Sequence, residues 1–114
     1  MDLLEHKQGD IVVVCPSGRI DHSNAAAFQQ ALQPYIDDCE AHQGVLVLDL
    51  SGLEYMSSVG LRVLVVAAKQ IEGTQATVVV CALQPVMQEI FSISRFDLIF
   101  DVYETREAAV GALA

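Results

Sequence analysis

Two adjacent serines, Ser57 and Ser58, stand just before a segment whose apolar residues recur at helical spacing. The first turn of a helix has backbone N–H groups without partners and carries the positive end of the helix dipole. A serine there can cap the helix, or it can carry a phosphate, because that end favours an anion. Capping is the commoner role, so the pair predicts either a helix cap or a phosphorylation site.

The residues around the serines suggest contact with a partner. A capping box would place Glu or Gln three residues on, where this chain has Gly60 and Leu61, and this absence is weak evidence against capping. Gly60 has no side chain, so we expect it to let another protein approach the serine hydroxyl. Tyr55 and Met56 are expected to expose apolar surface beside the serines. Together these residues form a candidate docking surface.

Catalytic chemistry finds little support in the sequence. A serine nucleophile needs a base and an orienting acid. Asp21 and His22 have suitable types, but nothing selects them as a relay. The chain has no G-x-S-x-G elbow, no P-loop and no G-x-G-x-x-G motif. We therefore predict that the protein is not an enzyme and needs no cofactor.

The cysteines and histidines do not have the spacing of a metal site. The cysteines are Cys15, Cys39 and Cys81, and the histidines are His6, His22 and His42. The cysteines are far apart and fall within apolar strand-like or helical patterns, so they are expected to be buried reduced thiols. We predict no zinc or other metal site.

Charge and composition limit the class of partner. The chain has 15 acidic and 6 basic residues, for a formal net charge of −9. Its few cations are scattered between Lys7 and Arg106, whereas binding to nucleic acid or to an anionic membrane requires them to cluster. The sequence therefore predicts no nucleic acid partner.

Length and hydropathy predict one soluble domain covering residues 1–114. An apolar fraction of 53% with 18% charged residues is typical of a folded chain. A membrane-spanning helix needs roughly 20 apolar residues, and no run here approaches that. The segment Met1–Lys7 lacks the apolar stretch of a signal peptide. We expect a cytoplasmic protein without membrane insertion.

The elements that must position the serines alternate along the chain. Runs of β-branched and other apolar residues predict buried strands, and apolar residues three and four apart predict helices. The expected strands are Ile11–Cys15, Val45–Leu48, Ala76–Cys81 and a short one beginning at Ile99 around Asp101–Tyr103, with Leu3–Glu5 as a candidate edge strand. The expected helices carry Phe28, Leu32, Ile36 and Cys39; Leu61 to Ile71; Val86, Ile90 and Phe91; and Ala108, Ala109 and Leu113. Pro34 is expected to kink or shorten the first helix, and Thr105 to cap the last.

This alternation predicts α/β architecture with βαβ crossovers. In such sheets, functional loops follow the carboxyl ends of strands. Two segments have that place, Ser17–Asn24 and Leu50–Ser58, and Leu50–Met56 is expected to be a loop. We therefore expect the chemistry of the protein to lie on these two segments.

The segment Val47–Leu61, V-L-D-L-S-G-L-E-Y-M-S-S-V-G-L, resembles the signature of STAS domains, in particular bacterial anti-sigma factor antagonists. Those proteins have a strand ending in a D-L-S-G-like turn, followed by D-S-[SAT]-G-L at the start of a helix. Gly18–Ala25 is similar to the family's G-x-[LI]-D segment before its first long helix. The resemblance extends from Ile11 to about Leu113. It implies the STAS fold, a small mixed β-sheet of four to five strands covered by about four helices.

The resemblance also implies a partner-switching function in transcription regulation. In the family, the unphosphorylated domain binds an anti-sigma factor, usually a serine kinase, and so releases the sigma factor. The kinase then phosphorylates the helix-start serine, and the complex stays apart until a phosphatase removes the phosphate. By position, the acceptor here is Ser58, and Asp21 matches the family's acidic residue in the neighbouring loop. The implied partner surface comprises Asp21, His22, Ser23, Asn24, Glu54, Tyr55, Met56, Ser57, Val59, Gly60 and Arg62.

Two residues depart from the family pattern. Ser57 replaces an Asp, which removes a carboxylate beside the future phosphate and creates a competing acceptor. Val59 replaces a small residue, and we expect its branched side chain to slow a kinase. Arg62 lies one helical turn beyond Ser58 and is expected either to approach the phosphate or to cover the helix flank.

Two other functions stay open at this point. The chain could be an unphosphorylated STAS scaffold subunit of an ABC-type lipid transport complex. Its apolar residues would then form a permanent docking site made of Tyr55, Met56, Val59, Val63 and Val66. A small-ligand or nucleotide-binding domain is the other alternative, and the missing phosphate-binding loop counts against it.

Overall fold

The computed structural model describes all 114 residues and has a five-stranded mixed sheet as its centre. The strand order is β1-β2-β4-β6-β7. These strands are β1 (Leu4–Gln8), β2 (Ile11–Cys15), β4 (Val45–Asp49), β6 (Thr77–Cys81) and β7 (Val102–Tyr103). Edge strand β1 runs antiparallel to β2, and the other neighbours are parallel. The predicted α/β class and small mixed sheet are confirmed.

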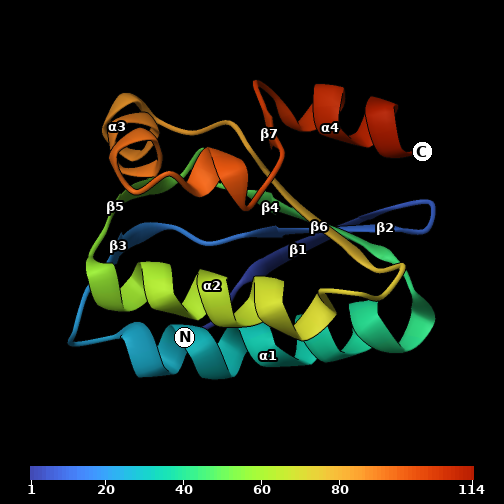
Figure 1. Ribbon diagram of the computed structural model, residues 1–114, viewed down its shortest axis with the longest axis horizontal. Helices are drawn as coiled ribbons and strands as arrows, with labels where there is room; N and C mark the ends of the chain where they lie inside the picture. The colour runs from blue at the N-terminus through green and yellow to red at the C-terminus, as the bar shows by residue number, and fades with distance from the viewer.

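Four helices cover this sheet unevenly. They are α1 (Ala25–His42), α2 (Ser58–Ile71), α3 (Pro85–Ile93) and α4 (Arg106–Leu113), with a 3₁₀ turn, η1, at Phe96–Leu98. Figure 1 shows α1 and α2 side by side under one face of the sheet, and α4 on the opposite face. None of the helices is both long enough and apolar enough to cross a bilayer.

The three central strands, β2, β4 and β6, consist mostly of apolar residues because both of their faces are buried. Leu48 packs into the large core with α1 and α2, whereas its neighbour Val47 packs with Ala109 of α4. Successive side chains of a strand point to opposite faces, so a strand covered on both sides reads as a continuous apolar run. This explains why these strands could be found from the sequence.

The predictions of loops at Ser17–Asn24 and Leu50–Met56 were wrong in part. Gly18–Ile20 forms strand β3 and Leu53–Met56 forms strand β5, and the two pair in parallel as a separate small sheet. Strands of three and four residues are too short for a periodic pattern to be recognised. The chain therefore has seven strands in two sheets.

Other helix predictions were confirmed or need limited correction. Helix α1 continues past the exposed Pro34, so of the two expected effects, a kink or an early end, the early end does not occur, and the predicted buried stripe is confirmed. In α3 the buried residues are Met87 and Phe91, and Val86, one of the apolar residues on which the prediction of this helix was based, is 50% exposed. The hydroxyl of Thr105 accepts a hydrogen bond from the N–H of Ala108 at 3.0 Å, as predicted for a cap.

Two smaller expectations also change. The strand predicted to begin at Ile99 begins at Val102, because Phe96–Leu98 forms the 3₁₀ turn and the chain reaches β7 only afterwards. All three cysteines are free, and Cys39 and Cys81 are buried, but Cys15 is only half-buried at the end of β2.

Candidate functional site

The β3–β5 pairing brings the two predicted functional segments together. Ile20 of β3 lies opposite Met56 of β5, and the N–H of Ser57 donates to the carbonyl of Ile20 at 2.8 Å. Asp21 therefore leaves β3 where Ser57 leaves β5. In Figure 1 this junction lies at the left end of the molecule, where α1 and α2 both begin.

Ser58 is the first residue of α2 and is exposed to solvent. The helix ladder begins with the bond from the N–H of Leu61 to the carbonyl of Ser57, at 2.9 Å. The N–H groups of Ser58, Val59 and Gly60 consequently have no acceptor in the chain. Free N–H groups at the positive end of a helix are a favourable setting for an anion.

Ser57 has a different environment from Ser58. It occupies the N-cap position of α2, but its side chain makes no capping hydrogen bond. Its hydroxyl oxygen is buried and has no hydrogen-bond partner. A kinase cannot reach a buried oxygen without a change in the protein. Ser58 is therefore the accessible hydroxyl of the pair, and the expectation of Ser57 as a competing acceptor loses its structural support.

Two expectations about this surface were wrong. Met56 is only 2% exposed, so it contributes to the core and cannot form part of an exposed docking surface. Gly60 is also buried, and a Cβ atom placed on it would lie 2.5 Å from Cγ of Met56 and 2.8 Å from Cγ2 of Ile20. Gly60 thus allows α2 to pack closely on the β3–β5 sheet, and does not open a path for a partner.

The loop that carries Asp21 is held by its own hydrogen bonds. Oδ1 of Asp21 accepts from the hydroxyl of Ser23 at 2.5 Å and from its N–H at 2.9 Å. These bonds hold the pKa of the Asp21 carboxyl below its usual range. Asn24 accepts from the N–H of Asp21 at 2.9 Å and donates to the carbonyl of Arg19 at 2.8 Å. The ordered loop thus presents an ionised carboxylate, with His22 and Ser23 exposed beside it.

Two arginines without ion-pair partners lie on this part of the structure. The guanidinium of Arg19 stacks 4.5 Å above the ring of half-buried Tyr55, a cation–π contact. Arg62 is exposed one turn after Ser58, and neither arginine belongs to an ion pair. Val59 is 46% exposed. A partner would therefore meet apolar, cationic and anionic groups around one exposed serine.

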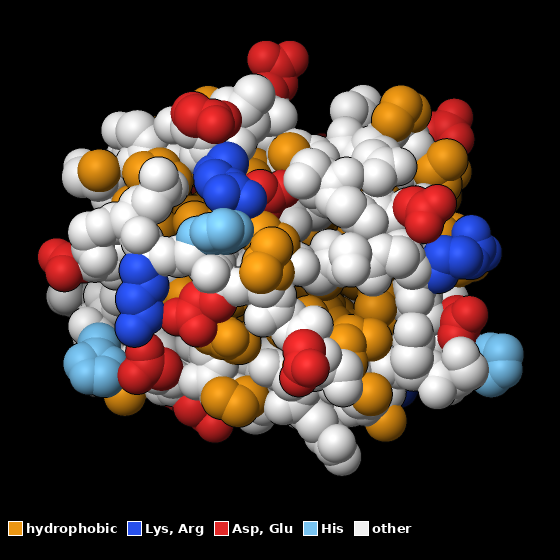
Figure 2. Space-filling view, turned by 180° about the vertical axis from the view of Figure 1, so that it is seen from behind, with side chains coloured by type: hydrophobic (Ala, Val, Ile, Leu, Met, Phe, Trp, Pro, Cys, Tyr) orange, Lys and Arg blue, Asp and Glu red, His pale blue; other side chains and the backbone are white.

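The basic residues do not form a patch on the face of the molecule that is hidden in Figure 1. Figure 2 views the chain from behind and shows its Lys and Arg side chains separated from one another. No group of His, Cys, Asp or Glu side chains lies where it could hold a metal ion.

The sequence did not reveal an ion pair between a buried carboxylate at the end of β4 and a partly exposed arginine at the start of α4. Asp49, at the end of β4, is 3% exposed, and its Oδ2 accepts from Nε of Arg106 at 2.8 Å. Its Oδ1 accepts from the N–H of Ser51 at 3.0 Å. Burial alone would raise the pKa of Asp49, but the bonds from Ser51 and Arg106 hold it below its usual range. The available signal was an acidic residue directly after a buried apolar run.

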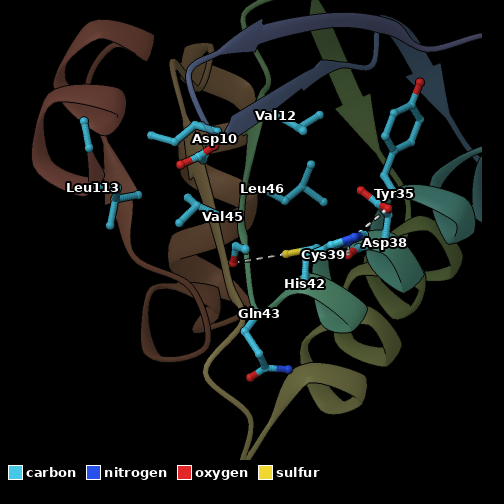
Figure 3. Close-up of a pocket in the computed structure, with 13 residues that line it drawn as sticks. Asp10, Val12, Tyr35, Asp38, Cys39, His42, Gln43, Val45, Leu46 and Leu113 are labelled. Atoms are coloured by element: carbon cyan, nitrogen blue, oxygen red, sulfur yellow. Dashed lines mark hydrogen bonds and ion pairs between the residues drawn. The ribbon is translucent and has the colours of Figure 1, made fainter.

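One hollow of the structure lies away from these residues. Figure 3 shows it between the end of α1 and the first residues of β2 and β4, with Tyr35, Asp38 and His42 on the helix side. Its volume is about 710 Å³. Helix α1 has 18 residues, about 27 Å at 1.5 Å per residue, and Ser58 lies near its opposite end. None of the predicted site residues lines this hollow.

Comparisons with known proteins agree on one family. The STAS domain model matches residues 4–109. The chain is 38% identical over 112 residues to BtrV of Bordetella bronchiseptica, a protein named as a candidate anti-sigma factor antagonist, covering 98% of this chain and 94% of BtrV. It is 29% identical, with a TM-score of 0.81, to the crystal structure of an anti-sigma factor antagonist from Mycobacterium paratuberculosis, covering 97% and 92% of the two chains.

A more distant structure shows the same fold. The phosphorylated form of the Bacillus cell fate determinant SpoIIAA superposes with a TM-score of 0.69 at 16% identity, covering 98% of this chain and 99% of that chain. The fold is therefore the one that the sequence predicted.

Proposed function

Because this chain belongs to the STAS domain family, we propose that it is an anti-sigma factor antagonist that works by partner switching. In its unphosphorylated form it binds an anti-sigma factor with serine kinase activity. Phosphorylation of Ser58 ends that complex, and a serine phosphatase restores it. The protein itself is a cytoplasmic, non-enzymatic regulator in this proposal.

The observation that carries the proposal is the position of Ser58. It is an exposed hydroxyl at the start of α2, and the junction with Ile20 sets it beside the loop of Asp21. The relatives named as anti-sigma factor antagonists support the same function, and SpoIIAA has a structure in a phosphorylated form.

The transfer itself needs chemistry from the partner. The kinase supplies ATP, whose γ-phosphoryl group would form a bond with Oγ of Ser58 while its bond to ADP breaks. The side-chain hydrogen bonds of the neighbouring Asp21 loop do not involve that hydroxyl, so the kinase would also accept the proton. The contribution of this chain is to present the hydroxyl on a rigid helix start.

The phosphate would act on the interface and leave the fold intact. It adds about 1.5 to 2 negative charges. Within this protein, the free N–H groups of the first turn of α2 would stabilise that charge. Against a partner that packs on Asp21 and Val59, the same group adds bulk and charge next to a carboxylate that is already ionised. Dissociation of the partner follows.

Binding measurements with two variants test the proposal. Ser58→Ala should bind the anti-sigma factor in the presence of ATP without being released, and Ser58→Asp should bind it weakly. Ser92→Ala removes another exposed serine, on α3, and should behave as the wild type. Equal release of the wild type and Ser58→Ala by ATP would contradict the proposal. Recovery of a transport ATPase in place of an anti-sigma factor, from the protein's own cells, would support the scaffold alternative.

A further inference from the structure

The ion pair of Asp49 and Arg106 joins two parts of the chain that are 57 positions apart in sequence. Arg106 is the first residue of α4, and Asp49 is the last residue of β4. Asp49 also binds the turn that follows β4, because its carboxylate accepts from the N–H of Ser51. Asp49 is the only polar or charged residue among the buried ones. A carboxylate buried to this degree needs its partners, so the pair fixes α4 and the turn relative to β4.

That turn leads into the small β3–β5 sheet and is hydrogen-bonded to it. The small sheet has no backbone ladder to the five-stranded sheet, so it is positioned by packing and by the turns that lead into it. Within the turn, the N–H of Leu53 donates to the carbonyl of Leu50 at 3.0 Å, and the N–H of Gly18 to the carbonyl of Gly52 at 2.9 Å. Nε2 of Gln84 donates to the carbonyl of Ser51 at 2.7 Å.

A short path along the chain then leads from the turn to Ser58, the proposed phosphorylation site. Leu53 begins β5, β5 ends at Met56, and Ser57 follows at once as the N-cap of α2. The guanidinium of Arg106 also reaches β2, since its Nη2 lies 3.3 Å from Sγ of Cys15. Arg106 thus ties the ends of two neighbouring strands to the turn that positions the Ser58 region.

We propose that Arg106 is a positioning residue for Ser58, which acts through Asp49 and the Ser51 turn to hold β5 and the first turn of α2 in place. This inference rests on the proposed function, because it takes Ser58 as the modified residue. It makes α4, on the face of the sheet opposite α1 and α2, part of the regulatory unit. By linkage, a change that loosens α4 changes the local stability of the Ser58 region, and modification of Ser58 changes the local stability of α4 while both keep their fold.

Amide hydrogen exchange measured by NMR on the full chain tests the coupling without any kinase. In Arg106→Met, the exchange rates of the Ser57 and Leu61 amides should increase about tenfold more than the exchange rate of the Phe28 amide in α1. The reason is that loss of the Arg106 contact lets the start of α2 open locally. All three amides are hydrogen-bonded in the structure. Equal acceleration at all three positions would overturn the inference, since it would report only a loss of overall stability.

Two further variants keep the test decisive. Arg106→Lys keeps the charge and should restore most of the protection at Ser57 and Leu61; if Arg106→Met does not fold, a smaller, selective acceleration in Arg106→Lys supports the inference and an unselective one overturns it. Asp49→Asn combined with Arg106→Met should accelerate exchange no more than Arg106→Met alone, because the two residues act through one contact. Additive effects would contradict that route.

Kinetics with the cognate kinase separate this inference from the proposed function. Arg106→Met should lower kcat/KM for phosphorylation of Ser58, and Arg106→Lys should recover part of it. If the wild type is not phosphorylated on Ser58, the proposed function fails, whereas the exchange result decides the coupling independently. An unchanged kcat/KM in a folded Arg106→Met variant would overturn the positioning role.

Discussion

Gly60 at the start of α2 lies directly against Ile20 of β3, so close that a single added methyl group would come within 2.8 Å of Cγ2 of that isoleucine. The same face of β3 and β5 contributes Met56 to this contact. Packing of α2 on the small sheet, together with the bond from Ser57 to Ile20, sets the place of the exposed Ser58. The start of α2, which carries the candidate phosphorylation site, is therefore held in place by tightly packed, buried residues.

Gly60→Ala should destabilise the fold. The new methyl group would overlap Met56 and Ile20, and overpacking of this kind costs about 1–3 kcal/mol. Urea denaturation followed by circular dichroism measures the change. Gly111→Ala is the matched control, because Gly111 lies in α4 with open space around its Cα, and the variant should gain up to about 1 kcal/mol from higher helix propensity. Equal effects at the two positions would contradict the packing assigned to Gly60.

Acid should weaken the fold partly through Asp49. Its pKa is lowered in the folded state, so the unfolded chain takes up protons first as the pH falls. The stability contributed by Asp49 is then present above its unfolded pKa of about 3.9 and is lost as the pH falls toward its folded pKa. Urea midpoints measured between pH 5 and about pH 3 should fall more steeply for the wild type than for Asp49→Asn. Parallel pH profiles would show that the carboxylate is not held as the structure indicates.

Removal of Arg106 should cost more stability than removal of an exposed ion-pair partner. Arg106→Met leaves the buried carboxylate of Asp49 with the Ser51 N–H but without its cation, and loss of one partner of a buried polar group typically costs about 1–3 kcal/mol. Lys7→Met removes a partner of Glu5 whose own side chain is 73% exposed, and such pairs contribute about 0–1 kcal/mol. Chemical denaturation of both variants at neutral pH gives the comparison. A small loss in Arg106→Met would mean that solvent or another group compensates for the missing guanidinium.

The three thiols should differ in their reactivity. Burial raises the pKa of Cys81 to about 12, and burial also raises the pKa of Cys39. Because the thiolate is the reactive form, both should resist a thiol reagent in the native state. Cys15 is half-buried and should react first but slowly, since its pKa is raised as well. Titration with Ellman's reagent before and after unfolding checks this order, and rapid native reaction of Cys81 would contradict it.

Val59→Ser should change recognition with little effect on stability. Val59 is 46% exposed, and exposed substitutions usually change stability by less than about 0.5 kcal/mol. Val59 follows Ser58 directly in the first turn of α2, so a smaller residue should let the kinase approach and raise the phosphorylation rate several-fold. Initial rates for the two proteins, with matched thermal unfolding curves, measure both effects. A slower rate in Val59→Ser would indicate that the kinase uses Val59 as a contact.

The sequence was sufficient for the elements with long, clear patterns. The strands Ile11–Cys15 and Val45–Asp49 and the stripe of α1 could be recognised because each has enough apolar residues to define a period. Helix α1 also continued past Pro34, because its buried stripe packs on both sides of that position. Strands β3 and β5 could not be recognised, since a partner on another segment determines that such short stretches are extended.

The site was predicted less completely than the fold. The location of Ser58 at a helix start followed from the residues alone, and the segment of Asp21 followed from its place after a predicted strand. The burial of Met56 and Gly60 depends on the β3–β5 pairing, and the ion pair of Asp49 with Arg106 joins residues 57 positions apart. Neither relationship has a local signature in the chain.

The most direct test of the central claim is peptide-resolved mass spectrometry of the wild-type chain after incubation with its cognate anti-sigma factor kinase and ATP, combined with a binding measurement on the product. Phosphate on Ser58 alone, with loss of binding to the anti-sigma factor, is the predicted result. Phosphate on Ser57 or on a residue away from the start of α2, or undiminished binding of the Ser58-phosphorylated chain, would contradict the account.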